Sequence, residues 1–352
     1  MASKLWVDRY RPSSLDQLDF HEDLTRLLHK LSAAADLPHL LFYGPSGAGK
    51  KTRVLALLSG LFGSGVYKTK CEARTFKVNS TNVDISVTSS NYHIDLTPAD
   101  VSYRDKVVVQ KIIKEIGGNR NPDQRAFKVV ILNQADQLSQ EAQAALRRTM
   151  EKCMATTRII LICNSLCRVI APLRSRCLCV RVPAASDLDI KTVISKVAGM
   201  EGAHIPEDLL DRLVEGSNRN MRRAIMILQS CCLQNTSLRG DIPVPVPDWE
   251  KLLREVASGV VEEQTPKRLK AVRGKLFDVL CSCISPNVIF LFLASELTRH
   301  CENEVKYEIA RYAAFYQLQM MAGSKPIMHL EAFLAKFMSI YKRHTNMLIA
   351  LM

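Results

Sequence analysis

The chain has 352 residues, of which 47% are hydrophobic, and it carries a formal net charge of +13. That length supports more than one buried core, and the ordinary glycine and proline contents without a repeating period exclude fibrous, disordered and repeat architectures. Residues 248–352 hold 14 Lys and Arg against 11 Asp and Glu, so +3 of the charge lies there and +10 precedes it. A basic excess favours a polyanionic partner such as DNA or RNA, although a solvated basic surface has the same composition.

Cysteine spacing and hydropathy bear on location. The eleven cysteines form no CxxC pairs at the spacing of a zinc site, and we interpret them as reduced thiols. The N-terminal sequence MASKLWVDRYRPSS lacks the apolar core of a signal peptide, and the apolar segment Val288–Leu297 is too short to span a bilayer. These features predict a cytosolic or nuclear protein without a membrane segment.

Short apolar or β-branched runs alternate with helical patterns in the first half of the chain. We expect strands at His39–Tyr43, Lys128–Leu132, Arg158–Cys163 and Leu178–Val182. This alternation predicts an α/β domain with a parallel sheet between helices on both faces. Between the first two strands, the segment Asp105–Ile116 predicts an amphipathic helix whose outer face carries Lys106, Lys111 and Lys114.

After Pro183 the pattern becomes that of consecutive helices. Ser186 and Asp189 have capping-box spacing, Pro206 opens a second helix, and residues Asn218–Gln234 form a third. The proline-rich stretch between residues 235 and 248 can continue neither a helix nor a central strand, which is typical of a linker.

The last hundred residues are expected to be entirely helical. Thr265-Pro266 and Ser285-Pro286 each place a hydroxyl N-cap before a proline suited to the first helical turn. Ile309, Ala313, Tyr316 and Met320 recur at helical spacing, which we interpret as a core stripe.

The strand HLLFY leads directly into the glycine-rich string GPSGAGKK and then into an apolar helix, the context of a phosphate-binding P-loop. Gly44, Gly47 and Gly49 let backbone N–H groups turn toward phosphate oxygens, and Lys50 adds a cation beside the helix N-terminus. The whole loop is the candidate nucleotide-binding segment: Gly44, Pro45, Ser46, Gly47, Ala48, Gly49, Lys50, Lys51 and Thr52.

One position of this loop does not suit a working ATPase. A Ser or Thr hydroxyl normally follows the Gly-Lys pair and binds Mg²⁺, but this chain has Lys51 there, with Thr52 one residue further around the helix. An ammonium at position 51 repels Mg²⁺ or partly replaces it beside the phosphates. We therefore expect ATP or ADP to bind with doubtful Mg²⁺ coordination, and no metal site is assigned.

The second nucleotide motif is also altered. A P-loop ATPase carries two carboxylates after the strand Lys128–Leu132, but this chain has Asn133 and Gln134. Neither amide accepts a proton, and losing a general base costs roughly 10²- to 10⁴-fold in rate. Asp136 is the nearest acid, but it is expected beyond the end of the strand. The sequence predicts a site that binds nucleotide without hydrolysing it.

Several motifs in order resemble the small subunits of replication factor C, the AAA+ clamp loader of eukaryotes and archaea. They are WVDRYRP (6–12), GPSGAGKKT (44–52), ALRRTME (145–151), SRC (175–177) and NMRRAI (220–225). The resemblance covers essentially the whole chain, and the altered ATPase motifs most resemble the family's subunit 3. It implies an AAA+ module in residues 1–182, a three-helix lid in 183–235, a linker in 236–247 and a helical oligomerisation collar in 248–352.

The resemblance also implies roles for single residues. Val7, Asp8, Arg9 and Tyr10 would lie against the adenine base; packing of this arm on the core is the alternative. Asn164 matches sensor 1 and Arg222 matches sensor 2, while Arg176 of the SRC triplet would reach a neighbour's ATP site as an arginine finger.

Further surfaces follow from the same resemblance. Arg104, Lys106, Lys111 and Lys114 would face DNA phosphates. Arg147 and Arg148 would serve an interface or a nucleotide relay, with no role resolved, and Leu57–Val66 would contact the clamp unless its apolar residues are core.

The function implied is that of a subunit of a nuclear hetero-pentamer that loads the PCNA clamp at primer-template DNA in replication and repair. It would be no enzyme alone, but would supply Arg176 to the ATPase complex. The alternatives are a small subunit shared with a checkpoint or cohesion loader, an independent AAA+ motor, which the missing acids disfavour, and an adaptor that binds no nucleotide, which the retained Lys50 disfavours.

Overall fold

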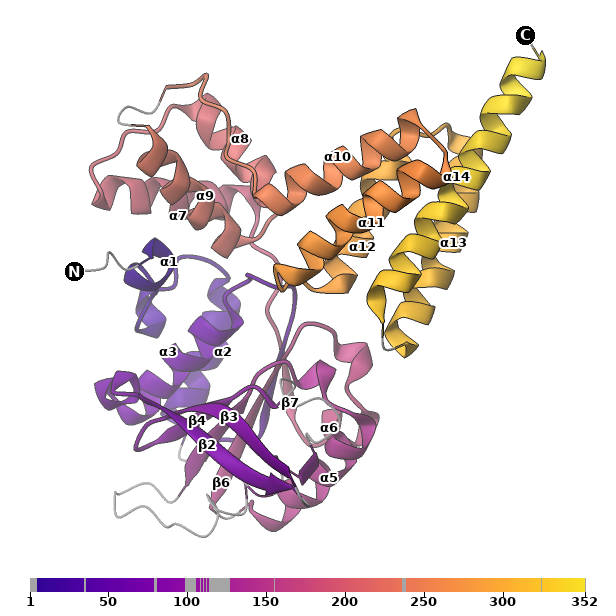
Figure 1. Ribbon diagram of the computed structural model, residues 1–352. Helices are drawn as coiled ribbons and strands as arrows, with labels where there is room; N and C mark the ends of the chain where they lie inside the picture. The colour runs from indigo at the N-terminus through magenta and orange to yellow at the C-terminus, as the bar shows by residue number, and fades with distance from the viewer. Residues whose placement is uncertain are drawn as a thin grey trace. The chain divides into compact units, whose positions relative to one another are not determined.

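The computed structural model describes residues 5–34, 36–78, 81–98, 106–107, 109, 111, 113, 127–154, 156–235, 239–323 and 325–351. The chain divides into two units, Met1–Val244 and Pro245–Met352. The first unit contains the sheet, the helices around it and a small helical lid, and the second unit is helical (Figure 1).

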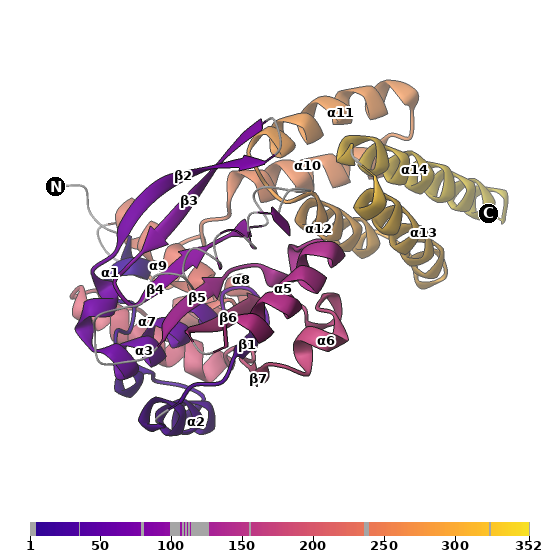
Figure 2. The same ribbon diagram turned by 90° about the horizontal axis from the view of Figure 1, so that it is seen from below.

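A seven-stranded sheet of order β2-β3-β4-β5-β6-β1-β7 organises the first unit (Figure 2). Its strands are β1 (Leu40–Tyr43), β2 (Lys70–Val78), β3 (Thr81–Ser89), β4 (His93–Leu96), β5 (Lys128–Leu132), β6 (Thr157–Cys163) and β7 (Leu178–Arg181). The five strands from β4 to β7 are parallel, whereas β2 and β3 form an antiparallel hairpin that extends the sheet beyond β4. The four predicted strands are confirmed. The sheet is mixed rather than purely parallel, because β3 pairs antiparallel with both β2 and β4. The sequence analysis did not predict β2, β3 or β4.

Alternate residues of the parallel strands face two separate cores. Leu41 and Val130 pack into one core with α5 (Gln140–Lys152) and α6 (Ala171–Arg174). Phe42 and Ile131 pack into the other with α2 (Glu22–Ala33) and α3 (Lys50–Phe62). Burial on both faces explains why these strands are continuous apolar runs. Because β1, β5 and β6 are parallel, their carboxyl ends lie at the same edge of the sheet, beside the N-terminus of α3.

The remaining short helices of the first unit link these layers. They are α1 (Trp6–Arg9), η1 (Leu15–Gln17), η2 (Ser64–Tyr67), η4 (Ala135–Gln137) and η5 (Leu166–Arg168). At the end of α3, Leu57, Leu58, Leu61 and Val66 are all buried in the core, so the apolar residues considered for clamp contact are explained by packing.

The lid consists of α7 (Asp187–Met200), α8 (Glu207–Ser217) and α9 (Met221–Gln234), which share a core of their own. The Ser186–Asp189 capping box forms as predicted. The third helix begins three residues later than predicted. Asn218 and Arg219 have positive φ angles of 50° and 60°, so they form the left-handed end of α8 and cannot belong to the first turn of α9. Asn220 is its N-cap and accepts a hydrogen bond from the N–H of Arg223.

Every secondary-structure element described in the C-terminal unit is a helix, as predicted. It contains α10 (Asp248–Glu262), α11 (Pro266–Cys281), α12 (Pro286–Arg299), α13 (Asn303–Ala322) and α14 (Pro326–Leu351). Thr265 caps α11 through its hydroxyl, but the Ser285 hydroxyl makes no capping bond to α12. The stripe predicted on α13 faces the core, with Ile309 and Met320 buried.

Candidate nucleotide-binding site

The P-loop follows β1 and ends at the first turn of α3, as the sequence predicts. Gly47 has a positive φ of 77°, and a Cβ there would lie 1.7 Å from the Asn220 side-chain oxygen. Only glycine therefore fits between this loop and the start of the lid helix α9. Pro45 and Ser46 are exposed, whereas Ala48 is buried beneath the turn.

Lys50 connects the P-loop to the end of β6. Its ammonium donates to the carbonyl oxygens of Gly44 and Pro45 at 2.7 and 2.8 Å, and to Oδ1 of Asn164 at 2.9 Å. Burial lowers the pKa of Lys50, and the nearby Arg222 guanidinium lowers it further. The structure thus brings together the P-loop lysine and the residue that matches sensor 1.

Lys51 is held on the other side of this turn. Its Nζ lies 2.5 Å from Oδ2 of Asp95 on β4, and Oδ1 of Asp95 accepts a hydrogen bond from Nδ2 of Asn133 at 2.6 Å. A magnesium site at a P-loop needs a hydroxyl and a carboxylate, but these two positions present an ammonium and an amide N–H. The residues present do not fit Mg²⁺. Asp95 was not identified from the sequence.

The other residues after β5 also lack the arrangement of a hydrolytic site. Gln134 is exposed and has a positive φ of 52°. Asp136 lies in η4, beyond the strand end as expected, where it is buried and accepts a hydrogen bond from the Ser165 N–H at 3.4 Å. Asp136 therefore fastens one loop to the next.

A cavity of about 500 Å³ opens beside the P-loop. Three parts of the first unit line it: the N-terminal segment, the first turn of α3 and the lid helices. The site residues predicted from the sequence that line it are Val7, Arg9, Tyr10, Gly47, Gly49, Thr52 and Arg222. This volume is within the usual range for small-molecule sites of roughly 300–1,000 Å³. Thr52, which the sequence analysis includes in the nucleotide-binding loop, contributes to this wall.

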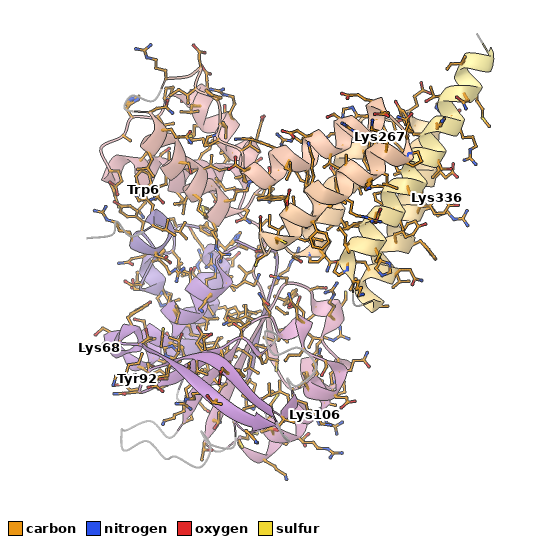
Figure 3. The ribbon with its side chains drawn as sticks, in the orientation of Figure 1. Trp6, Lys68, Tyr92, Lys106, Lys267 and Lys336 are labelled. Carbon is orange, nitrogen blue, oxygen red and sulfur yellow. The ribbon has the colours of Figure 1, made fainter. Side chains whose placement is uncertain are left out.

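The N-terminal segment is fixed to the lid. Trp6 lies at α1 beside the lid (Figure 3), and its backbone N–H donates to Oε1 of Gln229 at 3.1 Å. Arg9 pairs with Glu201 at 2.8 Å, and the Tyr10 hydroxyl donates to the same carboxylate. The arm therefore packs on the lid and also lines the cavity, while its contact with the adenine base stays a prediction. Asp8 lies outside the cavity lining and pairs with Arg11 at 3.0 Å.

Arg53 is a cavity residue that the sequence did not single out. Only 1% of its surface is exposed; its guanidinium lies 4.9 Å from the Phe20 ring centre and donates to the Phe20 carbonyl at 2.9 Å. Burial lowers the pKa of Arg53 to about 10. Within the described part of the chain, no carboxylate forms an ion pair with it. A lone arginine after a P-loop gives no sequence signal that separates it from a surface residue.

Arg176 lies just after α6, away from the cavity lining. Its Nε donates to Oε1 of Glu151 at 2.8 Å, and Arg147 approaches the same oxygen at 3.7 Å. Arg147 and Arg148 are both exposed, so neither belongs to the core.

Part of the predicted basic helix can be placed. Lys106 and Lys111 are exposed, while Val109 and Ile113 are buried, as an amphipathic helix requires. Lys106 lies beside α5 and pairs with Glu141 at 3.1 Å (Figure 3). Arg104 and Lys114 lie outside the described residues.

The described residues contain no cluster of three or more His, Cys, Asp or Glu arranged to hold a metal ion. No helix among them combines the length and apolarity needed to cross a membrane.

Three family models match successive parts of the chain. Residues 20–186 match "DNA polymerase III, delta subunit", residues 192–233 match "RCF1/5-like, AAA+ ATPase lid domain", and residues 249–345 match "Replication factor C subunit 3, C-terminal domain". Among solved structures, the RuvB Holliday junction branch migration motor of Thermotoga maritima is similar, with a TM-score of 0.50 at 17% identity over 76% of this chain and 85% of that chain. This likeness shows the AAA+ fold alone.

Curated relatives match at much higher identity. The chain is 47% identical to Replication factor C subunit 3 of Homo sapiens over 343 residues, which is 96% of each chain. It is 46% identical to Replication factor C subunit 3 of Arabidopsis thaliana over 345 residues, covering 96% of this chain and 98% of the relative. Subunit 5 of Schizosaccharomyces pombe is 41% identical over 345 residues, or 96% of each chain. This protein therefore belongs to the replication factor C family of AAA+ clamp-loader subunits, in the group whose members are named subunit 3 or subunit 5.

Proposed function

We propose that this chain is the subunit of a hetero-pentameric clamp loader that binds nucleotide without hydrolysing it and that supplies an arginine finger to a neighbour. The loader would place PCNA at primer-template junctions in the nucleus, during DNA replication and repair. The domain organisation proposed for this role is an AAA+ module in residues 1–182, a lid in 183–235, a linker in 236–247 and a collar in 248–352.

One observation supports the proposed lack of hydrolysis: the catalytic positions are altered, whereas the residues that bind phosphate are retained. Lys51, Asn133 and Gln134 stand where a P-loop ATPase needs a hydroxyl and two carboxylates. Lys50 is retained, and its Nζ donates to the Gly44 and Pro45 carbonyls and, at 2.9 Å, to Oδ1 of Asn164. Such a site would retain affinity for phosphates and lack a base to activate water.

The cavity beside the P-loop supports adenine binding. ATP or ADP would place its phosphates along the N-terminus of α3 and its base between the N-terminal arm and the lid. Val7 and Tyr10 line this cavity from the arm, and Arg222 lines it from the lid. Asp8 would act indirectly, through its pair with Arg11.

The remaining roles concern partners. Arg176 would complete the ATP site of the adjacent subunit, and Lys106 and Lys111 would contact DNA phosphates, together with Arg104 and Lys114. The eukaryotic relatives named as replication factor C subunits support the nucleus as the place of action. The checkpoint and cohesion loaders stay as alternative assemblies for the same chain.

The test is nucleotide binding and phosphate release measured on the same purified full-length chain. We expect ATP and ADP to bind and no phosphate to be released above the level of a Lys50→Ala variant. Release that depends on Lys50 would disprove the inactive site. Absence of any nucleotide binding would favour a purely structural adaptor.

A further inference from the structure

Lys51 occupies the position from which a P-loop ATPase binds its metal, and Asp95 holds it there. We propose that this ammonium is the resident cation of the site, so that the chain binds a nucleoside diphosphate or triphosphate without a divalent metal. The inference rests on the proposed nucleotide-binding function and goes beyond it, because it assigns the metal's place to two residues of the chain.

The carboxylate that anchors Lys51 belongs to the interior of the sheet. Asp95 is only 7% exposed, on the strand β4 that pairs with β5. Its Oδ2 lies 2.5 Å from Nζ of Lys51. A carboxylate this buried requires a paired charge and hydrogen bonds, and Lys51 is the cation that supplies the charge.

Asn133 completes this arrangement from the end of β5. Its backbone N–H donates to the Leu96 carbonyl at 2.9 Å, which fixes it beside β4, and its side-chain Nδ2 donates to Oδ1 of Asp95 at 2.6 Å. A carboxylate at position 133 cannot donate this bond and would repel Asp95. Lys51 and the amide of Asn133 thus bind the two carboxylate oxygens of the buried Asp95. The two departures from the ATPase motifs are therefore parts of one arrangement rather than independent losses of metal-binding groups.

The ammonium keeps capacity for a ligand. An ammonium has three N–H donors, of which one serves Asp95, and the Lys51 side chain is 43% exposed. It extends from the first turn of α3, where the helix N-terminus favours anions, next to Lys50. Two adjacent lysines at this helix start can approach phosphate oxygens, while the fixed positive charge of Lys51 opposes a divalent cation at the same point.

The experiment compares nucleotide affinity with Mg²⁺ and with EDTA on the full-length chain, using ADP and ATP as probes. For the unaltered chain we expect dissociation constants in the two buffers that agree within about twofold. The variant Lys51→Met should bind at least about tenfold more weakly in both buffers, because it loses the resident cation. Lys68→Met, an exposed lysine of the same unit labelled in Figure 3, is the matched control and should bind like the unaltered chain.

A gain-of-function variant gives the opposite test. Lys51→Thr combined with Asn133→Asp restores the hydroxyl and the carboxylate, so its nucleotide affinity should become at least about tenfold stronger with Mg²⁺ than with EDTA. Thermal melting of each variant checks that it is folded. Binding by the unaltered chain that requires Mg²⁺, or Lys51→Met binding as tightly as Lys68→Met, would overturn the resident cation and leave nucleotide binding intact. No binding in either buffer would overturn both.

Discussion

Arg176 donates from Nε and from a terminal nitrogen to the same oxygen of Glu151, at 2.8 and 2.6 Å. Its other terminal nitrogen donates to the Pro172 carbonyl at 3.0 Å. All three guanidinium nitrogens are therefore engaged within the chain. If Arg176 acts on a neighbour's nucleotide, it must exchange a carboxylate for a phosphoryl group. The carboxylate is planar and the phosphoryl group is tetrahedral, but both present oxygen atoms that a guanidinium binds through paired N–H groups.

Replacing Arg176 should therefore affect the neighbour and spare this chain. Arg176→Ala is expected to lower turnover at the adjacent ATP site by about 10³-fold or more, the usual contribution of an arginine finger. Arg176→Lys should not restore it, because an ammonium lacks the paired N–H geometry. Nucleotide binding by the isolated chain should be unchanged, since Arg176 lies outside the cavity lining. The measurement is ATPase activity of the assembled complex; equal activity of Arg176→Ala and the control Arg174→Ala would contradict the assignment.

The DNA-facing role of the basic helix can be tested on its described lysines. Lys106→Met together with Lys111→Met should weaken binding of the assembled loader to DNA equally for unrelated sequences, because phosphate contacts carry no sequence information. Each lost contact should reduce the slope of log affinity against log salt by about 0.9. Lys267→Met, an exposed lysine of α11 in the C-terminal unit, is the control. Loss of affinity for one sequence only, or an unchanged salt slope, would contradict this role.

The sequence predicted those features whose cause is local. The apolar run before the P-loop, the Ser186–Asp189 capping box and the Thr265 cap all form as expected, because each depends on neighbouring residues. The β2–β3 hairpin was missed although β3 carries a local signal: the buried Ile85 and Val87 alternate with the exposed Asp84 and Ser86, which is the pattern of a half-buried strand. The signal in β2 is weaker, because its described side chains are exposed or half-buried.

The candidate site divides in the same way. The P-loop is a contiguous motif, and its residues were identified from sequence. Asp95 was not, because its importance depends on pairing with Lys51 on α3 and Asn133 after β5, which the sheet order alone brings together. Arg53 was missed for a similar reason, since its burial depends on Phe20, which lies 33 residues earlier in the chain.

Gly47 offers a steric test of the contact between the P-loop and the lid. Gly47→Ala places a methyl group 1.7 Å from the Asn220 side-chain oxygen, at a φ of 77° that L side chains rarely adopt. Because Asn220 caps α9, the loop or the cap must move, and nucleotide affinity should fall by about tenfold or more. Gly199→Ala is the matched control: apart from its chain neighbours and the backbone of its own helix, no atom lies within 4 Å of the added Cβ. It sits inside α7, so it should stabilise the fold by about 0.4–1 kcal/mol and leave binding unchanged. Equal nucleotide affinities for the two variants would refute the contact.

We expect His39 to make the stability of the first unit depend on pH. Its Nδ1 accepts a hydrogen bond from the Ile159 N–H at 3.0 Å, which requires a neutral ring, and burial lowers its pKa from 6.5. The unfolded chain binds the proton more readily than the folded chain. The contribution of His39 to the free energy of unfolding should therefore be complete above pH 6.5 and should be lost as the pH falls below it. Each such histidine steepens this fall by at most about 1.4 kcal/mol per pH unit. His39→Asn keeps an acceptor near the Nδ1 position and does not titrate, so urea unfolding at several pH values should give a shallower fall for this variant; parallel curves would show that His39 is not the group responsible.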